Sequence, residues 1–221
     1  MKNLAAVICA VIALPGVTAQ SAKKSATPTA VTGRSEIMVV LGSATPVPLA
    51  ESPRPVAVLP VAPQSLAAVT PLDFLRGDSS VFLEQRGAGG AQSDIVLQGG
   101  SFEQTLVLLN GFRINDSQTS HHNLDLPVPL DAIDSIQVLE GAGSTLHGVD
   151  ALSGVVDFIT RAPDHEMLRL RAGAGAFEGN EEALLANALR GRWSGRVAAG
   201  RNFSTGFMTD RDYRNEEASA E

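Results

Sequence analysis

The sequence predicts a mixed α/β (α+β) domain of modest size, followed by a short run of two-faced antiparallel β-strands. Up to about residue 162, short β-prone runs alternate with short helical turns. The chain holds 21 Gly, 12 Pro and only 5 % aromatic residues, which favours strands and tight turns over a helical bundle. From residue 164 onward, side-chain character alternates with a period of two, typical of strands whose faces differ.

Length and charge restrict the class of protein. A chain of 221 residues that is 44 % hydrophobic can bury a sizeable core. Its net charge is −7 and its only lysines are Lys2, Lys23 and Lys24, whereas a nucleic-acid-binding protein needs a basic stripe to neutralise phosphates. The single cysteine, Cys9, excludes an intramolecular disulfide and a cysteine-based zinc site.

The first 19 residues have the pattern of a secretory signal peptide. Lys2 gives a positive start, residues 4–14 are apolar, and a Pro-Gly break precedes the small residues that end at Ala19. A transmembrane anchor is the alternative, but a helix that crosses a bilayer needs ~20 apolar residues. We therefore expect export and cleavage after Ala19. Because no later apolar stretch is long enough for a helix, any further membrane crossing would be by β-strands.

Residues 20–52 are predicted to form a flexible tether that carries one β-prone segment. Ser, Thr, Ala and Lys dominate residues 20–32, a composition too weakly hydrophobic to pack. The run 36–41 is apolar after its first residue and precedes a Pro-rich stretch at 46–55. An isolated strand must either join the sheet of its own domain or pair with a partner's edge. On structural grounds alone, docking onto its own domain is favoured.

Residues 53–163 are predicted to form the mixed domain. The nearly apolar run 105–109 is typical of a strand covered on both faces, and Asn110-Gly111 is a strong hairpin signal. Pro at a first helical position supports a short helix near 63–66. The expected strands are 56–59, 81–84, 94–98, 105–109, 136–139 and 155–160, the expected helical turns are 63–66, 73–75 and 129–135, and the expected glycine-rich turn is 87–90.

Residues 164–221 differ in character from the mixed domain. Residues 168–177 alternate strictly, and 183–189 with 193–203 predict a hairpin, followed by a polar loop at 204–215. Such strands resemble those of an outer-membrane barrel, in which Trp193, Phe203, Phe177 or Phe207 could lie at a membrane interface. An amphipathic hairpin of a soluble sheet, with these aromatic residues packed in it, is the alternative.

Two stretches resemble the plug domain of TonB-dependent outer-membrane receptors. The first is residues 107–116, Val-Leu-Leu-Asn-Gly-Phe-Arg-Ile-Asn-Asp. The second lies within residues 133–160 and follows the family's pattern. That pattern is a Ser at 144, a Gly at 148, a small-residue turn, Gly154, and a Val-Val-rich strand ending in Thr160. Glycines suit a domain that needs sharp turns and close backbone approach. The resemblance extends over about residues 36–215.

The resemblance implies a receptor of the cell outer membrane. In this family the plug fills a barrel of about 22 strands, a scarce ligand such as a siderophore or cobalamin is captured from outside, and uptake is driven through TonB by the ExbB–ExbD inner-membrane motor. A short segment before the plug, the TonB box, pairs with TonB as an added strand. The residues that look like this box are Glu36, Ile37, Met38, Val39 and Val40.

The sequence also departs from the family's pattern. Leu97-Gln98-Gly99 stands where Ile-Arg-Gly is common, Glu140-Gly141-Ala142 where Arg-Gly-Pro is common, and His147 where Tyr is usual. In the family those arginines meet carboxylates on the barrel wall, and a buried charge persists only when it is paired. The substitutions put that attachment between plug and barrel in doubt.

The resemblance places the ligand contacts in apical plug loops. His121 and His122 are adjacent in a polar loop with nearby carboxylates, so a metal site is one reading and a solvated or ligand-contacting loop the other. Adjacent side chains seldom reach one metal from the same side, so we expect no resident metal and no cofactor. The expected ligand-contacting residues are Arg86, Gln92, Asn115, Asp116, His121, His122 and Asn123.

No catalytic motif is present, so we expect no enzyme. Residues 141–145 lack the Gly-Lys-Ser/Thr of a phosphate loop, and neither a Gly-x-Ser-x-Gly nor a His-Glu-x-x-His pattern occurs. A closed barrel needs on the order of 220 residues before loops. The 58 residues of 164–221 supply three or four strands, so we expect the N-terminal part of a receptor. The alternative is a soluble periplasmic plug-like binding module without a barrel.

Overall fold

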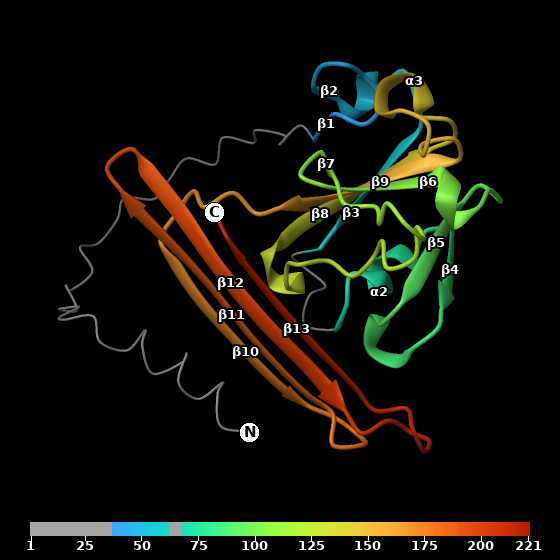
Figure 1. The fold of residues 1–221 in the computed structure, drawn as a ribbon. Helices are drawn as coiled ribbons and strands as arrows, with labels where there is room; N and C mark the ends of the chain where they lie inside the picture. The colour runs from blue at the N-terminus through green and yellow to red at the C-terminus, as the bar shows by residue number, and fades with distance from the viewer. Residues whose placement is uncertain (1–36, 62–67) are drawn as a thin grey trace. The chain divides into compact units, whose positions relative to one another are not determined.

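A computed structural model describes residues 37–61 and 68–221 of the chain (Figure 1). The predicted signal peptide, the first part of the tether, Glu36 and the predicted helix at 63–66 lie outside the described residues. Residues Glu36–Glu221 cluster as one unit, within which all the contacts below are made. We call residues 37–162 the mixed domain and the four strands after it the C-terminal sheet.

A five-stranded sheet forms the centre of the mixed domain. All neighbouring strands are antiparallel except β6 and β9, which run parallel. Thr105 pairs with Gly154 and Leu109 with Phe158 along that parallel ladder. In spatial order the strands are β3 (Val56–Pro60), β8 (Ile133–Glu140), β9 (Gly154–Thr160), β6 (Thr105–Leu109) and β7 (Phe112–Arg113).

Both faces of this sheet are covered. On one face Val107, Val138 and Phe158 belong to the main hydrophobic core. On the other face Leu106 and Val155 belong to a second apolar cluster. The prediction that 105–109 forms a strand buried on both sides is therefore confirmed, and the apolar character of both alternating sets of side chains explains it.

Short elements surround the sheet. The β4–β5 hairpin matches the strands predicted at 81–84 and 94–98, and α2 matches the helical turn predicted before Gly77. The remaining elements of the mixed domain are β1 (Met38–Val39), β2 (Val47–Pro48), η1 (Leu49–Glu51), α2 (Leu72–Leu75), β4 (Val81–Gln85), η3 (Ala88–Gly90), β5 (Ser93–Leu97), η4 (Phe102–Gln104), η5 (Leu130–Ala132) and α3 (Ser144–His147).

The helix predicted at 129–135 is shorter than expected. Only Leu130–Ala132 forms a 3-10 turn, and β8 begins at Ile133, which pairs with Thr160. Ladder hydrogen bonds to β9 thus outweigh the weak local helix signal. The turn predicted at Asn110-Gly111 is confirmed, because both residues have positive φ, 52° and 79°, as a tight hairpin requires.

The C-terminal sheet is built from four strands in chain order, each antiparallel to the next (Figure 1). The predicted hairpin is confirmed, with Arg190 paired to Trp193. The predicted loop at 204–215 ends earlier, because Tyr213 already pairs with Ser204. The strands are β10 (Met167–Ala174), β11 (Asn180–Arg190), β12 (Trp193–Ser204) and β13 (Tyr213–Ala220).

The two faces of the C-terminal sheet differ in polarity. Leu168 and Leu170 are 65 % and 69 % exposed, whereas Arg196 is only 2 % exposed. Leu185 and Ala198 point away from the face of Leu168 and Leu170 and pack on Ala132 of η5. Leu168 and Leu170 of β10 therefore face away from the mixed domain, whereas Met167 at the start of β10 packs against the cluster around Ala132. Among the described residues, no helix has the length and apolar character needed to cross a membrane.

Candidate functional site

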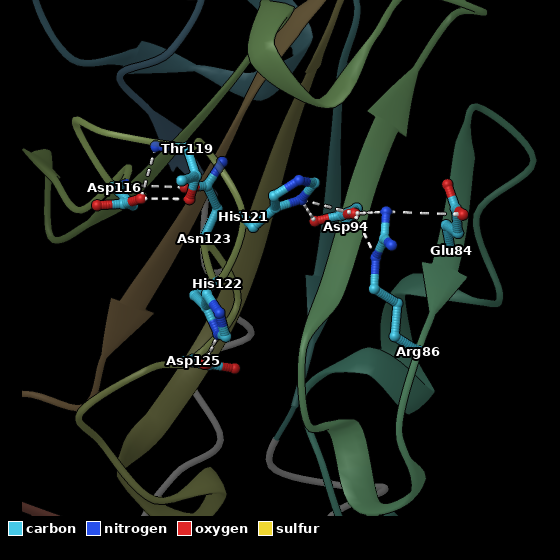
Figure 2. Close-up of polar contacts among 9 residues, drawn as sticks. All are labelled: Glu84, Arg86, Asp94, Asp116, Thr119, His121, His122, Asn123 and Asp125. Carbon is cyan, nitrogen blue, oxygen red and sulfur yellow. Dashed lines mark hydrogen bonds and ion pairs between the residues drawn. The ribbon is translucent and has the colours of Figure 1, made fainter.

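A buried carboxylate organises the residues predicted to contact a ligand. Asp94 lies at the start of β5 and its side chain is 1 % exposed. Arg86 Nε and Nη2 lie 3.2 and 3.1 Å from Asp94 Oδ2, and His121 Nδ1 lies 3.0 Å from Oδ1. Figure 2 shows Asp94 between the other two side chains. Since a buried carboxylate needs such partners, Asp94 fixes the orientation of both Arg86 and His121.

The imidazole of His121 is held by a second contact. Its ring stacks on Phe102, with centroids 4.5 Å apart and an interplanar angle of 26°. The guanidinium of Arg86 also lies 3.9 Å from Glu84. Both Arg86 and His121 remain partly exposed, so they can present N–H groups to a polar ligand while Asp94 balances the charge of Arg86. The sequence did not identify Asp94, because its partners are distant along the chain.

Asp116 organises the polar loop that carries the histidines. Its Oδ2 accepts hydrogen bonds from the backbone N–H of Thr119, at 2.8 Å, and from Thr119 Oγ1, at 2.6 Å. These bonds, above all the one from the Thr119 side chain, lower the pKa of Asp116. The backbone N–H of Asp116 in turn donates to Asn123 Oδ1 at 2.9 Å. The loop is therefore held by its own side chains.

Two of the predicted contact residues have structural partners. Asn115 Oδ1 accepts from the backbone N–H of Val107 at 2.7 Å, and its Nδ2 donates to the carbonyl of Thr105 at 3.0 Å. Asn123 is almost fully buried. Both asparagines therefore hold the loop in place. Asp116 and His121 are partly exposed and His122 is exposed.

The two adjacent histidines point in different directions. His121 faces Asp94, whereas His122 Nδ1 lies 2.7 Å from Asp125 Oδ2 (Figure 2). Ser120 and His122 have positive φ, 53° and 65°, so the backbone turns sharply on both sides of His121. Within the described part of the chain, no group of three His, Cys, Asp or Glu side chains could hold a metal ion.

The glycine-rich turn at 87–90 contacts the C-terminal sheet. The carbonyl of Gly89 accepts a hydrogen bond from Asn215 Nδ2 at 2.9 Å. A Cβ at Gly89 would lie 2.1 Å from the ring of Tyr213, so only glycine fits. Gln92 follows this turn with φ of 48°, and its carbonyl accepts from the backbone N–H of Arg86 at 3.2 Å. The turn thus positions Arg86 through the backbone.

A separate cavity adjoins these residues on the side of Asp125. Its volume is about 390 Å³, and it is lined by residues 124–130 and by polar side chains of the C-terminal sheet such as Arg171, Glu181 and Glu217. None of the seven residues predicted to contact a ligand lines it. We therefore take the exposed surface around Asp94, and not this cavity, as the candidate ligand site.

The segment predicted to be the TonB box is docked on its own domain. We call residues 37–41 the strap. Val39 pairs with Val47, and Ile37 accepts a hydrogen bond from the backbone N–H of Leu49 at 2.8 Å. His147 Nε2 lies 3.2 Å from the carbonyl oxygen of Leu41. Val39 and Leu41 are buried, while Ile37, Met38 and Val40 remain partly exposed.

Two of the positions where the sequence departs from the pattern that it resembles, Gln98 and Glu140, lie close together. Gln98 Nε2 donates to Glu140 Oε2 at 3.4 Å. The charged contact between the mixed domain and the C-terminal sheet instead involves Asp131, which lies 2.9 Å from Arg171 and 3.6 Å from Arg169. The carboxylate is thus on the mixed domain and the arginines are on β10, whereas the family's pattern places arginines on the plug.

Comparison with known proteins gives three findings on sequence. The family model of the TonB-dependent receptor plug domain matches residues 48–155. The vitamin B12 transporter BtuB of Vibrio vulnificus strain YJ016 is 35 % identical over 97 residues, which cover 44 % of this chain and 16 % of that protein. BtuB of Vibrio cholerae strain ATCC 39541 is 27 % identical over 142 residues, which cover 64 % of this chain and 22 % of that protein.

Solved structures share the fold. The pyoverdine outer-membrane receptor FpvA of Pseudomonas aeruginosa PAO1 superposes with a TM-score of 0.61 at 16 % identity and covers 77 % of this chain and 25 % of its own. The ferric yersiniabactin uptake receptor FyuA of Yersinia pestis superposes with a TM-score of 0.62 at 20 % identity. The match covers 76 % of this chain and 28 % of that receptor.

The chain spans less than a third of the length of each of these relatives. The family model ends at residue 155, within β9. The fold of the described chain is that of a TonB-dependent receptor plug with barrel strands. The named relatives are vitamin B12 transporters, an uptake receptor and an outer-membrane receptor. These findings, together with the fold, show that the chain belongs to the family of TonB-dependent receptors.

Proposed function

We propose that this chain is the plug-bearing part of an outer-membrane receptor that gates energy-coupled uptake of a scarce ligand such as a siderophore or cobalamin. The observation that carries the proposal is the continuity of a plug fold with strands whose apolar side chains face outward. The relatives matched by sequence are vitamin B12 transporters, and those matched by fold include siderophore receptors. A role in transport accounts for these features without catalysis.

The ligand is proposed to contact the exposed side chains around Asp94. Arg86 and His121 are oriented by that carboxylate, and Asp116 and His122 lie on the adjoining loop. Gln92 adjoins them, and Asn115 and Asn123 support the loop. Partly exposed donors on a rigid support suit recognition of a polar ligand, because little side-chain entropy is lost on binding.

A binding titration tests this site. We expect the full chain in detergent to bind either vitamin B12 or ferric pyoverdine in isothermal titration calorimetry. His121→Ala should weaken that binding at least tenfold, equivalent to ~1.4 kcal/mol. His165→Ala is the matched control, because His165 is exposed and lies in the connection before β10. Equal affinity of the chain and the His121→Ala variant would count against the site.

We further propose that the strap, with Glu36, pairs with TonB as an added strand, and that the ExbB–ExbD motor drives TonB. Pairing at an edge strand draws affinity from the main chain. Met38 lies in β1 and keeps an exposed side chain. Capture by purified TonB should be lost in Met38→Pro, because proline removes a backbone donor. Met208→Pro, in the exposed loop before β13, should leave capture unchanged, and capture of both variants alike would refute the assignment.

Export to the outer membrane is proposed to depend on removal of residues 1–19. FpvA, which shares the fold, is an outer-membrane receptor, and the leader pattern of this chain ends at Ala19. Mass spectrometry of the chain recovered from outer-membrane fractions should show an N-terminus at Gln20. Recovery of the chain with Met1 at its N-terminus would exclude cleavage.

A further inference from the structure

The strap contacts one of two polar side chains that are paired across the central sheet. Asp157 of β9 and Gln137 of β8 are directly opposite in the antiparallel ladder, so they share one face. The neighbouring pair on that face is Val155 and Leu139, which are apolar and belong to the cluster that Leu41 of the strap completes. A carboxyl and an amide are therefore buried within an otherwise apolar layer.

Neither polar side chain is fully satisfied there. Asp157 is fully buried, and its Oδ1 accepts a hydrogen bond from the backbone N–H of Gly111 at 3.2 Å. Asp157 Oδ2 and Gln137 Oε1 have no hydrogen-bond partner among the described residues. Gln137 Nε2 donates to the carbonyl of Met38 at 3.4 Å, which ties this pair directly to the strap. A buried acceptor without a donor costs free energy that water would relieve.

We propose that the strap is a displaceable cover whose docking is controlled by the charge on Asp157. A protonated Asp157 carries an O–H that can donate to the free Gln137 oxygen, so the docked strap is favoured. An ionised Asp157 places two acceptors face to face without a donor, so lifting of the strap and hydration of both groups are favoured. The link to a partner rests on the proposed pairing of β1 with TonB.

The surroundings of Asp157 favour its protonated form while the strap is docked. Burial raises the pKa of Asp157 to about 6, while the backbone N–H groups of Gly111 and Asn110 and the nearby His147 partly oppose the increase. Arg113 lies on the same face two strands away and is ion-paired with Asp150. The strap residues 37–41 contribute no charged side chain. On β6, the residue that pairs with Asp157 is the apolar Leu108.

The expected pH dependence follows from these values. The pKa of Asp157 is 3.8 when it is solvated and about 6 when it is covered, so the covered state binds the proton more tightly. Docking is therefore strongest below about pH 4 and weakens as the pH rises through about 6. A difference of about two pKa units changes the docking equilibrium by up to about 100-fold.

A spin label on the strap tests this proposal without any partner. In the full chain carrying Cys9→Ser, Met38→Cys provides one thiol for a nitroxide, whose mobility is measured by electron paramagnetic resonance. We expect the ratio of mobile to immobile label to rise at least tenfold between pH 4.5 and 7.5. In Asp157→Asn the label should stay immobile at both pH values, because the amide is neutral and can donate to Gln137.

Two further variants separate the groups that could titrate. Asp150→Asn removes a partly exposed carboxylate beside Arg113, and His147→Gln removes the imidazole while keeping a donor for the Leu41 carbonyl. Both should keep the pH response. A response absent from the parent chain, or one that survives Asp157→Asn or disappears in His147→Gln, would overturn the proposal. A failure of TonB capture alone would leave the spin-label result unaffected.

Discussion

The two larger sheets of the described chain differ in the side chains that they bury. In the five-stranded sheet Ile136, Val138 and Phe158 are fully buried, whereas in the C-terminal sheet Leu170 is exposed and Arg196 is buried. The first sheet is therefore held by hydrophobic burial. The second contacts the mixed domain through a small apolar cluster and through charged groups. Alternation along a strand shows that its faces differ, but the neighbour that each face meets decides which one is buried.

The largest effect is expected from a substitution in the hydrophobic core of the five-stranded sheet. Phe158→Ala should lower the free energy of unfolding of the mixed domain by about 3–5 kcal/mol, because a large buried ring is replaced by a cavity. Urea denaturation in mild detergent measures this loss. Leu170→Ala, on the exposed face of β10, should change the same free energy by no more than about 0.5 kcal/mol. Similar losses in both variants would contradict the comparison.

The second prediction tests the charged contact between the two regions. Asp131→Ala should destabilise the attachment of β10 by about 3 kcal/mol or less, because a buried carboxylate is lost while Arg171 keeps Glu181 as an ion-pair partner. Hydrogen exchange of the β10 amides, followed by mass spectrometry, should become faster. Asp134→Ala, which removes an exposed carboxylate, is the control. Unchanged exchange in Asp131→Ala would show that the apolar cluster alone holds the sheet.

The third prediction concerns a polar group inside the apolar layer. The pKa of Asp157 is raised to about 6 in the fold and is near 3.8 when unfolded. Protonation therefore favours the folded state, and the stability contributed below about pH 4 is lost as the pH rises through about 6. Asp157→Asn should raise the free energy of unfolding by about 2 kcal/mol at pH 7.5 and flatten its pH dependence. Denaturation curves at pH 4.5 and 7.5 measure this. Asp164→Asn, an exposed carboxylate, should change neither value.

The smallest effect is expected at the positions that depart from the family. Gln98 and Glu140 are linked by one exposed, long hydrogen bond. Gln98→Ala should change the free energy of unfolding by no more than about 0.5 kcal/mol. A loss above about 1 kcal/mol in the urea experiment would mean that this pair, and not Asp131, is the important polar contact of the mixed domain.

Local signals allowed much of the fold to be predicted. The apolar runs at 105–109 and 155–160, the Asn110-Gly111 turn and the β11–β12 hairpin each depend on residues close in sequence. The helix at 129–135 was overestimated because pairing of Ile133 with a strand more than twenty residues away replaced it. The start of β13 at Tyr213 was missed for the same reason, since its polar sequence is typical of a loop.

The candidate site could be predicted only in part. Arg86 and His121 were identified from residue type and resemblance, but the carboxylate that joins them was not, because Asp94 lies 8 and 27 residues away from them. The roles of Asn115 and Asn123 as loop supports depend on backbone groups that no sequence pattern reveals. Docking of the strap was favoured on general grounds, but its contacts with Gln137 and His147 were not expected.

The close packing of Gly89 against β13 has a consequence for the order of folding. The hydrogen bond between Asn215 and Gly89 joins residues 126 positions apart, and the Tyr213 ring occupies the space that any side chain at residue 89 would need. Contacts of such long sequence separation form late, since a large loop must be closed first. We expect the β4–β5 hairpin and its turn to be complete before β13 attaches, so that attachment of β13 depends on the shape of that turn.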